Sequence, residues 1–278
     1  FYGFDADKKA NKLAAAIFTA SRRTLKMVGL PDYTETSVEL IGAESQYGVN
    51  AAVANCRELS MKIAVKHSDP AGIGILLKEC VGLGLATPPG LSGFAGARPK
   101  PSPVVRLFSF ALPKGSIKIQ IEMDGTYIDC PDTLGAPLKR ELIERPQALS
   151  APLDSNTVHV PLIKLALARS GDKGNKANVG IIARQPEYLP YIYAALNEQA
   201  VAERFAHFLP EGATQQSLSY VERYLMPGTH AINFLIHDVL GGGGMASIRN
   251  DAQGKGFGQL MLDASIPVSA AIAAEVNA

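Results

Sequence analysis

The stretch "LALARSGDKGNKANVGIIAR" (residues 165–184) places two apolar runs on either side of a turn rich in charged and amide side chains. Residues 160–168 are apolar or alternate as a buried strand does, and residues 178–183 resume that character, which predicts an antiparallel hairpin. A hairpin reverses with about two to five turn residues, so this polar link exceeds what chain reversal requires. We therefore expect the turn to bind something.

Hydrophobic periodicity in the first half of the chain predicts helices and half-buried strands in alternation. An amphipathic helix over residues 7–28 is stopped by Gly29 and Pro31. Asp69 and Pro70 cap a second helix. Period-two alternation predicts four strands, at residues 36–44, 58–69, 104–113 and 116–125.

Residues 131–156 carry four prolines and no sustained period, which is typical of a linker between domains. We expect domains at residues 1–130 and 157–278. For the second domain the pattern predicts strands at 158–168, 177–184, 217–226 and 230–238, helices at 187–208 and 256–263, and an edge strand at 264–268. The fold class is α+β, with two α/β sandwich domains, the second a ferredoxin-like antiparallel sheet covered by helices.

Composition excludes several kinds of partner. The chain has 278 residues, 47% of them apolar, and a net charge of +1, so it has no basic field for nucleic acid. No apolar run approaches the roughly 20 residues of a membrane span. Three scattered cysteines form neither a zinc motif nor a disulfide framework, which favours the reducing cytoplasm. The chain starts at Phe1, and we expect it to be a fragment or one subunit of a split enzyme.

The polar turn is the first candidate site. Gly171 and Gly174 permit dihedral angles that let successive N–H groups converge on an anion, and Arg169 and Lys173 add positive charge. Asp172 is expected to orient a cation, transfer a proton or cap the turn. The alternative is a surface loop whose polar groups satisfy one another.

The second candidate site lies in "GTHAINFLIHDVLGGGGMASIRN" (residues 228–250). Along a strand, Asn233 and His237 share one face, and His230 lies on the other. Four consecutive glycines, Gly241 to Gly244, cost much conformational entropy, so we expect the backbone there to approach a ligand or a partner chain closely. Alternation after Met245 predicts another strand that aims Arg249 at the same pocket. No carboxylate stands at metal-ligand spacing, so we expect no metal, and the alternative for both histidines is a hydrogen-bonded structural role.

A proline-rich turn, "FAGARPKPSPVVR" (residues 94–106), gives a third and weaker signal. Arg98, Lys100 and Arg106 offer a cationic rim for a carboxylate or phosphate, or they merely solvate a loop.

Taken together, "LARSGDKGNKANVGIIAR" and "VERYLMPGTHAINFLIHDVLGGGGMASIRNDAQGKGFGQLMLD" resemble the C-terminal domain of the acyclic terpene utilisation protein (AtuA) family. In the first region "GLPDYTETSVELIGAES", "AVKHSDP" and "FAGARPKPSPVVRLFSFALP" resemble the end of that family's main domain. The resemblance implies a ferredoxin-like second domain and a setting in acyl-CoA catabolism of branched or isoprenoid acids. The polar residues it carries over are Arg169, Ser170, Asp172, Lys173, Asn175, Asn178, His230, Asn233, His237 and Arg249.

The leading hypothesis is an enzyme, or the active-site-completing subunit of one, that acts on a carboxylate or CoA thioester of a branched acid by a hydratase or lyase step. Asp172, Lys173 and His237 are the expected catalytic residues, without any cofactor. The expected substrate-binding residues are Arg169, Ser170, Asn175, Asn178, His230, Asn233, Gly242, Gly243 and Arg249. The alternative is a non-catalytic assembly or ligand-binding subunit, in a homo-oligomer or with a companion subunit. Catalysis requires Asp172, Lys173, His237 and Arg249 to surround one cavity.

Overall fold

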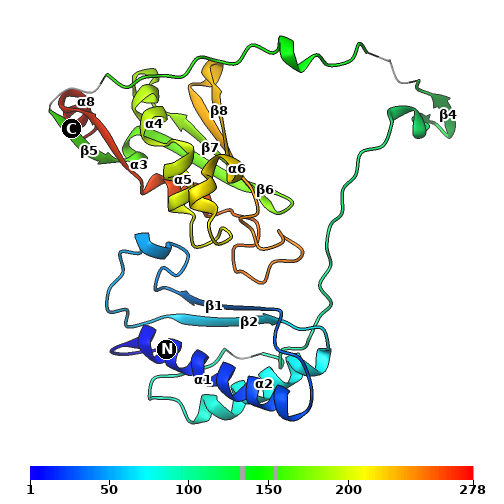
Figure 1. The fold of residues 1–278 in the computed structure, drawn as a ribbon, viewed down its shortest axis with the longest axis vertical. Coiled ribbons are helices and arrows are strands. Elements are labelled where there is room, and N and C mark those ends of the chain that lie inside the picture. Colours follow the sequence, from blue (N-terminus) through cyan, green and yellow to red (C-terminus); the bar gives the residue numbers. More distant parts are fainter. Residues whose placement is uncertain (95, 132–134, 153–155, 278) are drawn as a thin grey trace.

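The computed structural model describes residues 1–94, 96–131, 135–152 and 156–277. The described chain begins with a helix, two strands and a second helix, and a long connection with one hairpin follows (Figure 1). These elements are α1 (Ala6–Met27), β1 (Glu35–Ile41), β2 (Ser60–Lys66), α2 (Pro70–Leu85), β3 (Gln120–Met123) and β4 (Thr126–Asp129).

The first body is a two-stranded antiparallel sheet with α1 and α2 packed against it. Strand residues Val38 and Ile63 are directly opposite each other and pack against a buried cluster that includes Leu13, Ile17 and Leu25 of α1. The predicted cap of α2 is confirmed, because Ala71 N–H donates to Asp69 Oδ1 at 2.8 Å. The apolar stripe of α1 and the inward alternation of the strands therefore produce this layer.

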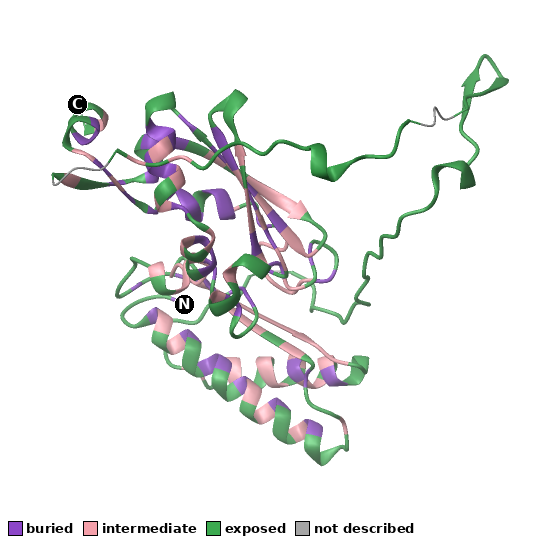
Figure 2. Cartoon of the chain, turned by 45° about the horizontal axis from the view of Figure 1, so that its top comes forward, coloured by how far each residue is buried: buried purple, intermediate pink, exposed green. Residues whose placement is uncertain are grey.

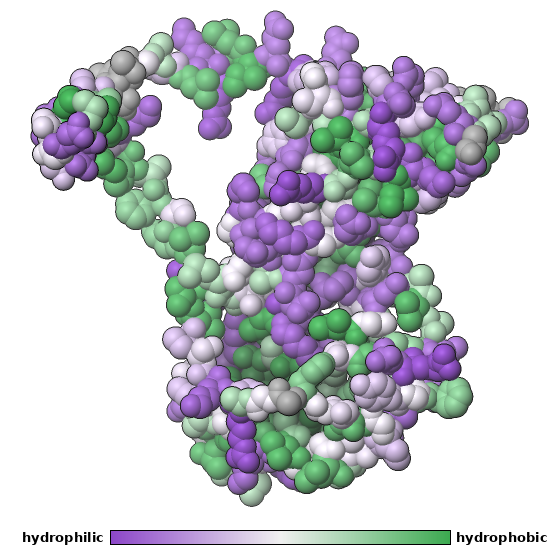
Figure 3. Space-filling model, turned by 180° about the vertical axis from the view of Figure 1, so that it is seen from behind, coloured by the Kyte–Doolittle hydropathy of each residue, from purple (hydrophilic) through white to green (hydrophobic). Residues whose placement is uncertain are grey.

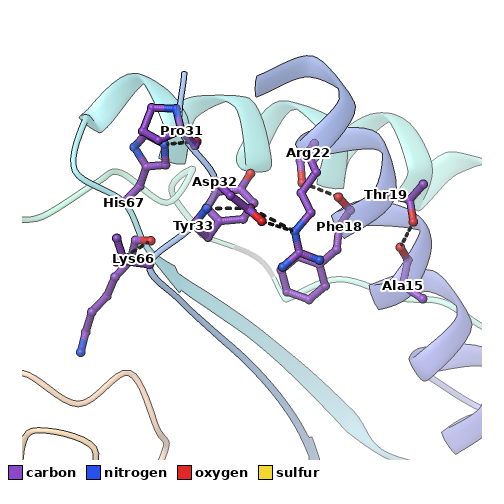
Figure 4. A network of polar contacts seen from close by, with 11 residues as sticks. Ala15, Phe18, Thr19, Arg22, Pro31, Asp32, Tyr33, Lys66 and His67 are labelled. Carbon is purple, nitrogen blue, oxygen red and sulfur yellow. Dashed lines mark hydrogen bonds and ion pairs between the residues drawn. The ribbon is translucent and has the colours of Figure 1, made fainter. Parts of the chain in front are cut away.

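A polar network fixes the turn that follows α1 (Figure 4). Arg22 Nε lies 3.0 and 3.1 Å from the two oxygens of Asp32. The His67 ring accepts from Asp69 N–H at Nδ1, 2.9 Å away, and its Nε2 lies 2.9 Å from the Pro31 carbonyl oxygen. Nδ1 also lies 2.8 Å from the Asp69 carbonyl oxygen, so both ring nitrogens have partners and the imidazole is held at both ends. The Tyr33 ring packs edge-on against this imidazole.

The second body is a four-stranded antiparallel sheet in the order β6-β7-β9-β8, with a separate two-stranded sheet of β5 and β10. Helices cover one face of the larger sheet (Figure 1). Its strands are β5 (Thr157–Pro161), β6 (Ala166–Lys173), β7 (Lys176–Ala183), β8 (Val221–Met226), β9 (Ala231–Ile236) and β10 (Ser265–Ser269). Its helices are α3 (Leu162–Leu165), α4 (Leu189–Ala195), α5 (Glu198–Arg204), α6 (Ser217–Tyr220), α7 (Phe257–Leu262) and α8 (Ala270–Asn277).

The larger core lies between the helices and one face of this sheet. Val179, Ile181, Phe234 and Ile236 point into it from β7 and β9. Phe205 stacks on Phe257 with ring centroids 4.7 Å apart, which joins α5 to α7. The α+β class and the helix-covered antiparallel sheet agree with the expectation from sequence.

Three predicted elements of the second body are divided in the structure. The helix expected at 187–208 ends at Ala195, and a new one begins after Asn197, whose side chain accepts from Ala200 N–H at 2.9 Å. The strand expected at 158–168 is interrupted by the single turn α3, whose Leu162 and Leu165 are fully buried. The strand expected at 217–226 starts only at Val221, because α6 occupies its first four residues.

Of the two strands predicted in the connecting region, one is wrong and the other is shorter than expected. Residues 104–113 form no regular element, and a strand runs only over part of 116–125. The hairpin reverses at Asp124 and Gly125, with φ of 50° and 74°, and not at Lys114 and Gly115. The strand expected after Met245 is also wrong, since residues 245–249 form no strand. The expected linker, residues 131–156, lies partly outside the described residues.

Contacts between the two bodies centre on a buried carboxylate of β1. Glu39 accepts from Asn250 N–H, with 3.0 and 2.7 Å to its two oxygens, and its Oε2 lies 3.1 Å from Lys62 Nζ. Lys62 also donates to the Ile248 carbonyl at 2.8 Å. The His207 ring lies 2.8 Å from the Gln46 carbonyl through Nε2. The loop after β9 is therefore held by charged groups of the first body.

Candidate functional site

The uncovered face of the four-stranded sheet gathers most of the polar side chains of its strands. Residues directly opposite each other point to the same side, so the pairs Arg169–Gly180, Asn178–Leu235 and Tyr224–Asn233 define this face. None of the polar residues on it is fully buried (Figure 2). They are Arg169, Lys173, Lys176, Asn178, Glu222, Tyr224, Asn233 and His237.

His237, Glu222 and Tyr224 form a hydrogen-bonded row on this face. His237 Nε2 lies 2.6 Å from Glu222 Oε1, and the Tyr224 hydroxyl donates to the other oxygen of the same carboxylate. Hydrogen bonds from Tyr224 and His237 lower the pKa of Glu222. The nearby positive charge of Lys176 also lowers it, because it stabilises the ionised carboxylate. The bond to Glu222 raises the pKa of Tyr224, against a small opposing effect of the Arg145 charge. The row thus combines an ionised carboxylate, an imidazole and a neutral phenol.

Two amide side chains lie beside this row. Asn178 Nδ2 donates to Asn233 Oδ1 at 2.8 Å, so the two amides are joined across β7 and β9. Gly180 is directly opposite Asn233 and carries no side chain, which leaves the Asn233 amide uncrowded on that side. The Nδ2 of Asn233 and the Oδ1 of Asn178 offer a donor and an acceptor to a guest.

A cleft of about 390 Å³ adjoins the row at the edge strand β8. Tyr224 and Leu225 form one wall, and residues 143–146 of the connecting chain form the other. Arg223 lines the cleft but is engaged, because its Nη1 donates to the Tyr193 carbonyl at 2.7 Å and its Nε lies 3.3 Å from Glu198. Arg145 is the second cation of this lining.

Ser170 and Asp172 alternate with Arg169 and Lys173 and so point to the opposite, helix-covered side. Ser170 Oγ accepts from Gly258 N–H at 2.8 Å and donates to the Lys255 carbonyl at 3.1 Å. Asp172 Oδ1 lies 3.8 Å from Lys255 Nζ. Both side chains hold the start of α7 against β6.

The two glycine-rich stretches lie against each other, as expected, and each contacts the other's backbone. Gly242 N–H donates to Asn175 Oδ1 at 2.7 Å, and Asn175 Nδ2 donates to Asp238 at 3.1 Å. Gly243 is buried with φ of 78°, and a Cβ there would lie 2.2 Å from the Gly174 carbonyl oxygen. The close approach predicted for the glycines is therefore made to the chain's own β6–β7 turn.

Arg249 and His230 lie away from the row. Arg249 Nη1 donates to the Val239 carbonyl at 2.5 Å, and its guanidinium carbon lies 5.0 Å from the centroid of the Phe208 ring. Burial lowers the pKa of Arg249. His230 is exposed, has φ of 49° and precedes β9, so it stands at the opposite end of that strand from His237.

Two family models match two separate parts of the chain. Residues 1–123 match "Acyclic terpene utilisation family protein AtuA", and residues 160–267 match "AtuA ferredoxin-like domain". The chain belongs to the AtuA family. Membership gives it a context of acyclic terpene utilisation, and the second body is a ferredoxin-like domain. Searches among curated proteins and among solved structures found no match.

In this AtuA-family chain the expected site residues fall into two groups. Arg169, Lys173, Asn178, Asn233 and His237 share the uncovered face of the ferredoxin-like sheet. The other expected residues lie elsewhere, at Ser170, Asp172, Asn175, His230, Gly242, Gly243 and Arg249. The expected cavity shared by Asp172, Lys173, His237 and Arg249 is therefore not formed, because adjacent residues of a strand face opposite ways.

Sequence reasoning missed Glu222, Tyr224, Lys176 and Arg145. Alternation in "YVERYL" places Glu222 and Tyr224 on one face, but only the register of β8 with β9 shows that this face carries His237. Among the residues that the structure describes, no three His, Cys, Asp or Glu side chains are grouped as a metal would require. Nor does any described helix combine the length and apolar character needed to cross a bilayer.

Proposed function

We propose that this chain is an enzyme, or the active-site-completing subunit of one, that adds or removes water at a carboxylate or CoA thioester of a branched or isoprenoid acid. The reacting groups are His237 and its neighbours on the uncovered sheet face. The observation that carries the proposal is the 2.6 Å contact between His237 Nε2 and Glu222 Oε1 beside a cleft. The AtuA family context supports the class of substrate.

Glu222 prepares His237 to act as a general base. Its carboxylate accepts from Nε2–H, which leaves the lone pair on Nδ1 and stabilises the imidazolium that forms when Nδ1 takes a proton. Tyr224 donates to the same carboxylate and keeps it ionised, since its hydrogen bond is the largest cause of the lowered pKa of Glu222. This arrangement replaces the expected proton transfer by Asp172, which faces the other side of the sheet.

The neighbouring amides and cations supply the binding groups. The Asn233 Nδ2 donates to the thioester oxygen, where negative charge develops as an enolate forms. Arg169 and Lys173 hold an anionic end of the substrate, with Arg145 in the adjoining cleft. The N–H groups of Gly242 and Gly243 are already bonded to Asn175 Oδ1 and the Leu240 carbonyl, so they take no part.

Hydration proceeds in two balanced steps. His237 Nδ1 removes a proton from water as the water oxygen bonds to the β-carbon of an enoyl thioester, and the electron pair of the carbon–carbon double bond moves to form the enolate. The imidazolium then returns that proton to the α-carbon. The sum is one water molecule added across the double bond, and dehydration is the reverse.

Deuterium exchange tests the proposal. A β-methyl-branched enoyl-CoA is incubated with the protein in deuterated water, and deuterium at the α-carbon of recovered thioester and product is measured by mass spectrometry. His237→Gln is expected to lower the exchange rate by about a hundredfold or more. His159→Gln is the matched control, because His159 is exposed on β5 and contacts only Ser265 in the described hydrogen bonds. Equal rates in wild type and His237→Gln would refute the assignment.

A second candidate function is a ligand-binding or assembly subunit without turnover. Leu167, Ile182 and Met226 also lie on the uncovered face and are about half exposed, which suits docking of an apolar surface. Calorimetry with the same thioester separates the two functions. Binding that His237→Gln leaves intact, with no exchange in wild type, would favour the subunit.

A further inference from the structure

The β9–α7 loop, residues 237–256, is held by two charged residues of the first body. In Figure 1 this loop extends from the end of β9 toward β1 and β2, and on the face seen in Figure 3 hydrophilic residues gather where the two bodies meet. Val38 and Leu40 belong to the buried cluster with α1, so Glu39 between them points to the other side of the sheet. Lys62 is directly opposite Glu39 and shares that side. The pair therefore faces the second body.

The two charges hold one short stretch of loop backbone. Glu39 accepts from Asn250 N–H at 2.7 Å, and Lys62 donates to the Ile248 carbonyl at 2.8 Å. The Glu39 side chain is only 6% exposed, so Asn250, Lys62 and the amide of Gln46 replace water around its charge. Removing a partner from a buried charge is costly, because the charge is left uncompensated. The loop is thus fixed to β1 and β2 by charge-assisted hydrogen bonds.

Arg249 lies between these two fixed peptides and carries the constraint back to the start of the loop. Its Nη1 donates to the Val239 carbonyl at 2.5 Å, and its Nη2 donates to the Phe208 carbonyl at 3.3 Å. Burial lowers the pKa of this guanidinium, and the negative charges of Glu35 and Glu39 oppose that shift. The first body therefore fixes the backbone on both sides of Arg249 and complements its charge.

Val239 follows His237 by two residues, and the chain between them has little freedom. His237 N–H donates to the Tyr220 carbonyl at 2.8 Å. Asp238 has φ of 51°, and Val239 is fully buried. A shift of the Val239 peptide is therefore passed to the His237 ring, whose Nε2 lies 2.6 Å from Glu222 Oε1.

We propose that the Glu39–Lys62 pair is a positioning element, by which the first body sets the His237 imidazole against Glu222. Neither residue of the pair lines the cleft beside the row, so both act through the loop backbone and Arg249. The consequence for turnover rests on the proposed function, since a reacting imidazole needs close alignment. A displacement of about 1 Å can cost about a hundredfold in rate.

Lys62→Met tests this role, because methionine keeps much of the volume of lysine and removes both the charge and the donor to Ile248. Proton–nitrogen correlation spectra of the imidazoles report which ring nitrogen carries the proton, and the spectrum of His237→Gln assigns the signals of His237. Wild type is expected to show the Nε2–H form, which the Glu222 carboxylate favours. Lys62→Met is expected to move the signals of both ring nitrogens toward a mixture of tautomers. It is also expected to lower deuterium exchange at the α-carbon about tenfold or more.

Two further variants keep the charge of the pair. Lys62→Arg retains the cation and a donor for Ile248, and it is expected to restore both the ring signals and the exchange rate. Glu39→Asp draws the carboxylate back by one methylene group, and it is expected to fall between wild type and Lys62→Met. Arg22→Met is the matched control, because it breaks the ion pair with Asp32 inside the first body and leaves the Glu39–Lys62 pair intact. The control is expected to give the wild-type ring signals.

Unchanged His237 signals in both Lys62→Met and Glu39→Asp would overturn the proposal, whatever their Tm. The same change of signals in Arg22→Met would also overturn it, since general loss of stability would then be the cause. Failure of the proposed function is distinguishable from failure of this one. Wild-type protein without deuterium exchange would refute the proposed function, and the ring signals would still decide the positioning role.

Discussion

Replacing Gly243 by alanine is expected to destabilise the ferredoxin-like domain strongly. At φ of 78° an L-residue is strained by about 1–2 kcal/mol. The new Cβ would lie 2.2 Å from the carbonyl oxygen and 2.8 Å from the carbonyl carbon of Gly174, which are backbone atoms of a hydrogen-bonded turn. Overpacking of this kind costs about 1–3 kcal/mol, so the sum is about 2–5 kcal/mol.

Thermal unfolding followed by circular dichroism measures this cost. At about 2–4 °C per kcal/mol for a chain of this size, Gly243→Ala is expected to lower Tm by about 4–20 °C. Gly244→Ala is the matched control. Its φ lies outside the left-handed region, and its nearest neighbour is the flexible Gln253 side chain, 3.3 Å from the added Cβ. Gly244→Ala is expected to change Tm by only a few degrees.

The two variants also separate a structural role from a ligand-binding one. If Gly243 serves the loop-to-loop contact, the loss of stability comes first, and any loss of deuterium exchange follows unfolding. A Gly243→Ala protein with the wild-type Tm that fails to bind or exchange the thioester would refute the reasoning. In that case the glycines would serve ligand binding.

Three further predictions concern single groups. The pKa of Glu222 is lowered in the folded protein, so the stability that its ionised form contributes is fully present above the ordinary pKa of 4.5 and is lost as pH falls through the lower folded pKa. Tyr224→Phe removes a hydrogen bond to this carboxylate and is expected to raise the folded pKa of Glu222, as measured by carboxyl NMR. Burial lowers the pKa of His207 below 6.5, so the folded state opposes its protonation, and stability is expected to fall as pH drops below 6.5; His207→Gln should flatten the dependence of Tm on pH. Gly72→Ala would place a Cβ 2.5 Å from the His67 ring, which hydrogen bonds hold at both ends, and is expected to cost about 1–3 kcal/mol in urea unfolding.

Local signals were sufficient for elements whose cause is local. The cap at Asp69, the stripe of α1 and the presence of a hairpin follow from a few neighbouring residues and are confirmed. The long polar turn expected within that hairpin is wrong, because β6 runs to Lys173 and β7 begins at Lys176, which leaves only Gly174 and Asn175 for the reversal. The break at Asn197 was also readable, since its side chain is a preferred helix cap, but a continuous apolar period concealed it. The strand predicted at residues 104–113 is wrong because its formation depends on a distant part of the chain. The alternation of these residues fits a strand, but a strand needs a partner, which a sequence pattern cannot supply.

Alternation along a single strand predicts which side chains of that strand share a face, and this was the only part of the site that the sequence could predict. Asn233 and His237 were placed on one face correctly, because both lie on or beside β9. Glu222 was not linked to His237, since their contact depends on the register between β8 and β9. Arg249 was expected in a pocket but caps the Val239 carbonyl, because the residues before it turn instead of forming a strand.

The density of polar residues in "RSGDKGNKAN" has two separate causes. Strand geometry sends Arg169, Lys173 and Asn178 to the uncovered face and Ser170 and Asp172 to the helix side. On the helix side the polar groups are consumed, since the Ser170 hydroxyl satisfies the Gly258 N–H at the start of α7 and Asp172 faces Lys255. The sequence suggests one binding turn, but the structure divides these residues into two sets. Ser170 and Asp172 form a structural set that holds α7, and Arg169, Lys173 and Asn178 form an open set on the uncovered face. The open set, joined by Glu222 and Tyr224 from β8, is the one to which the proposed function assigns substrate contacts.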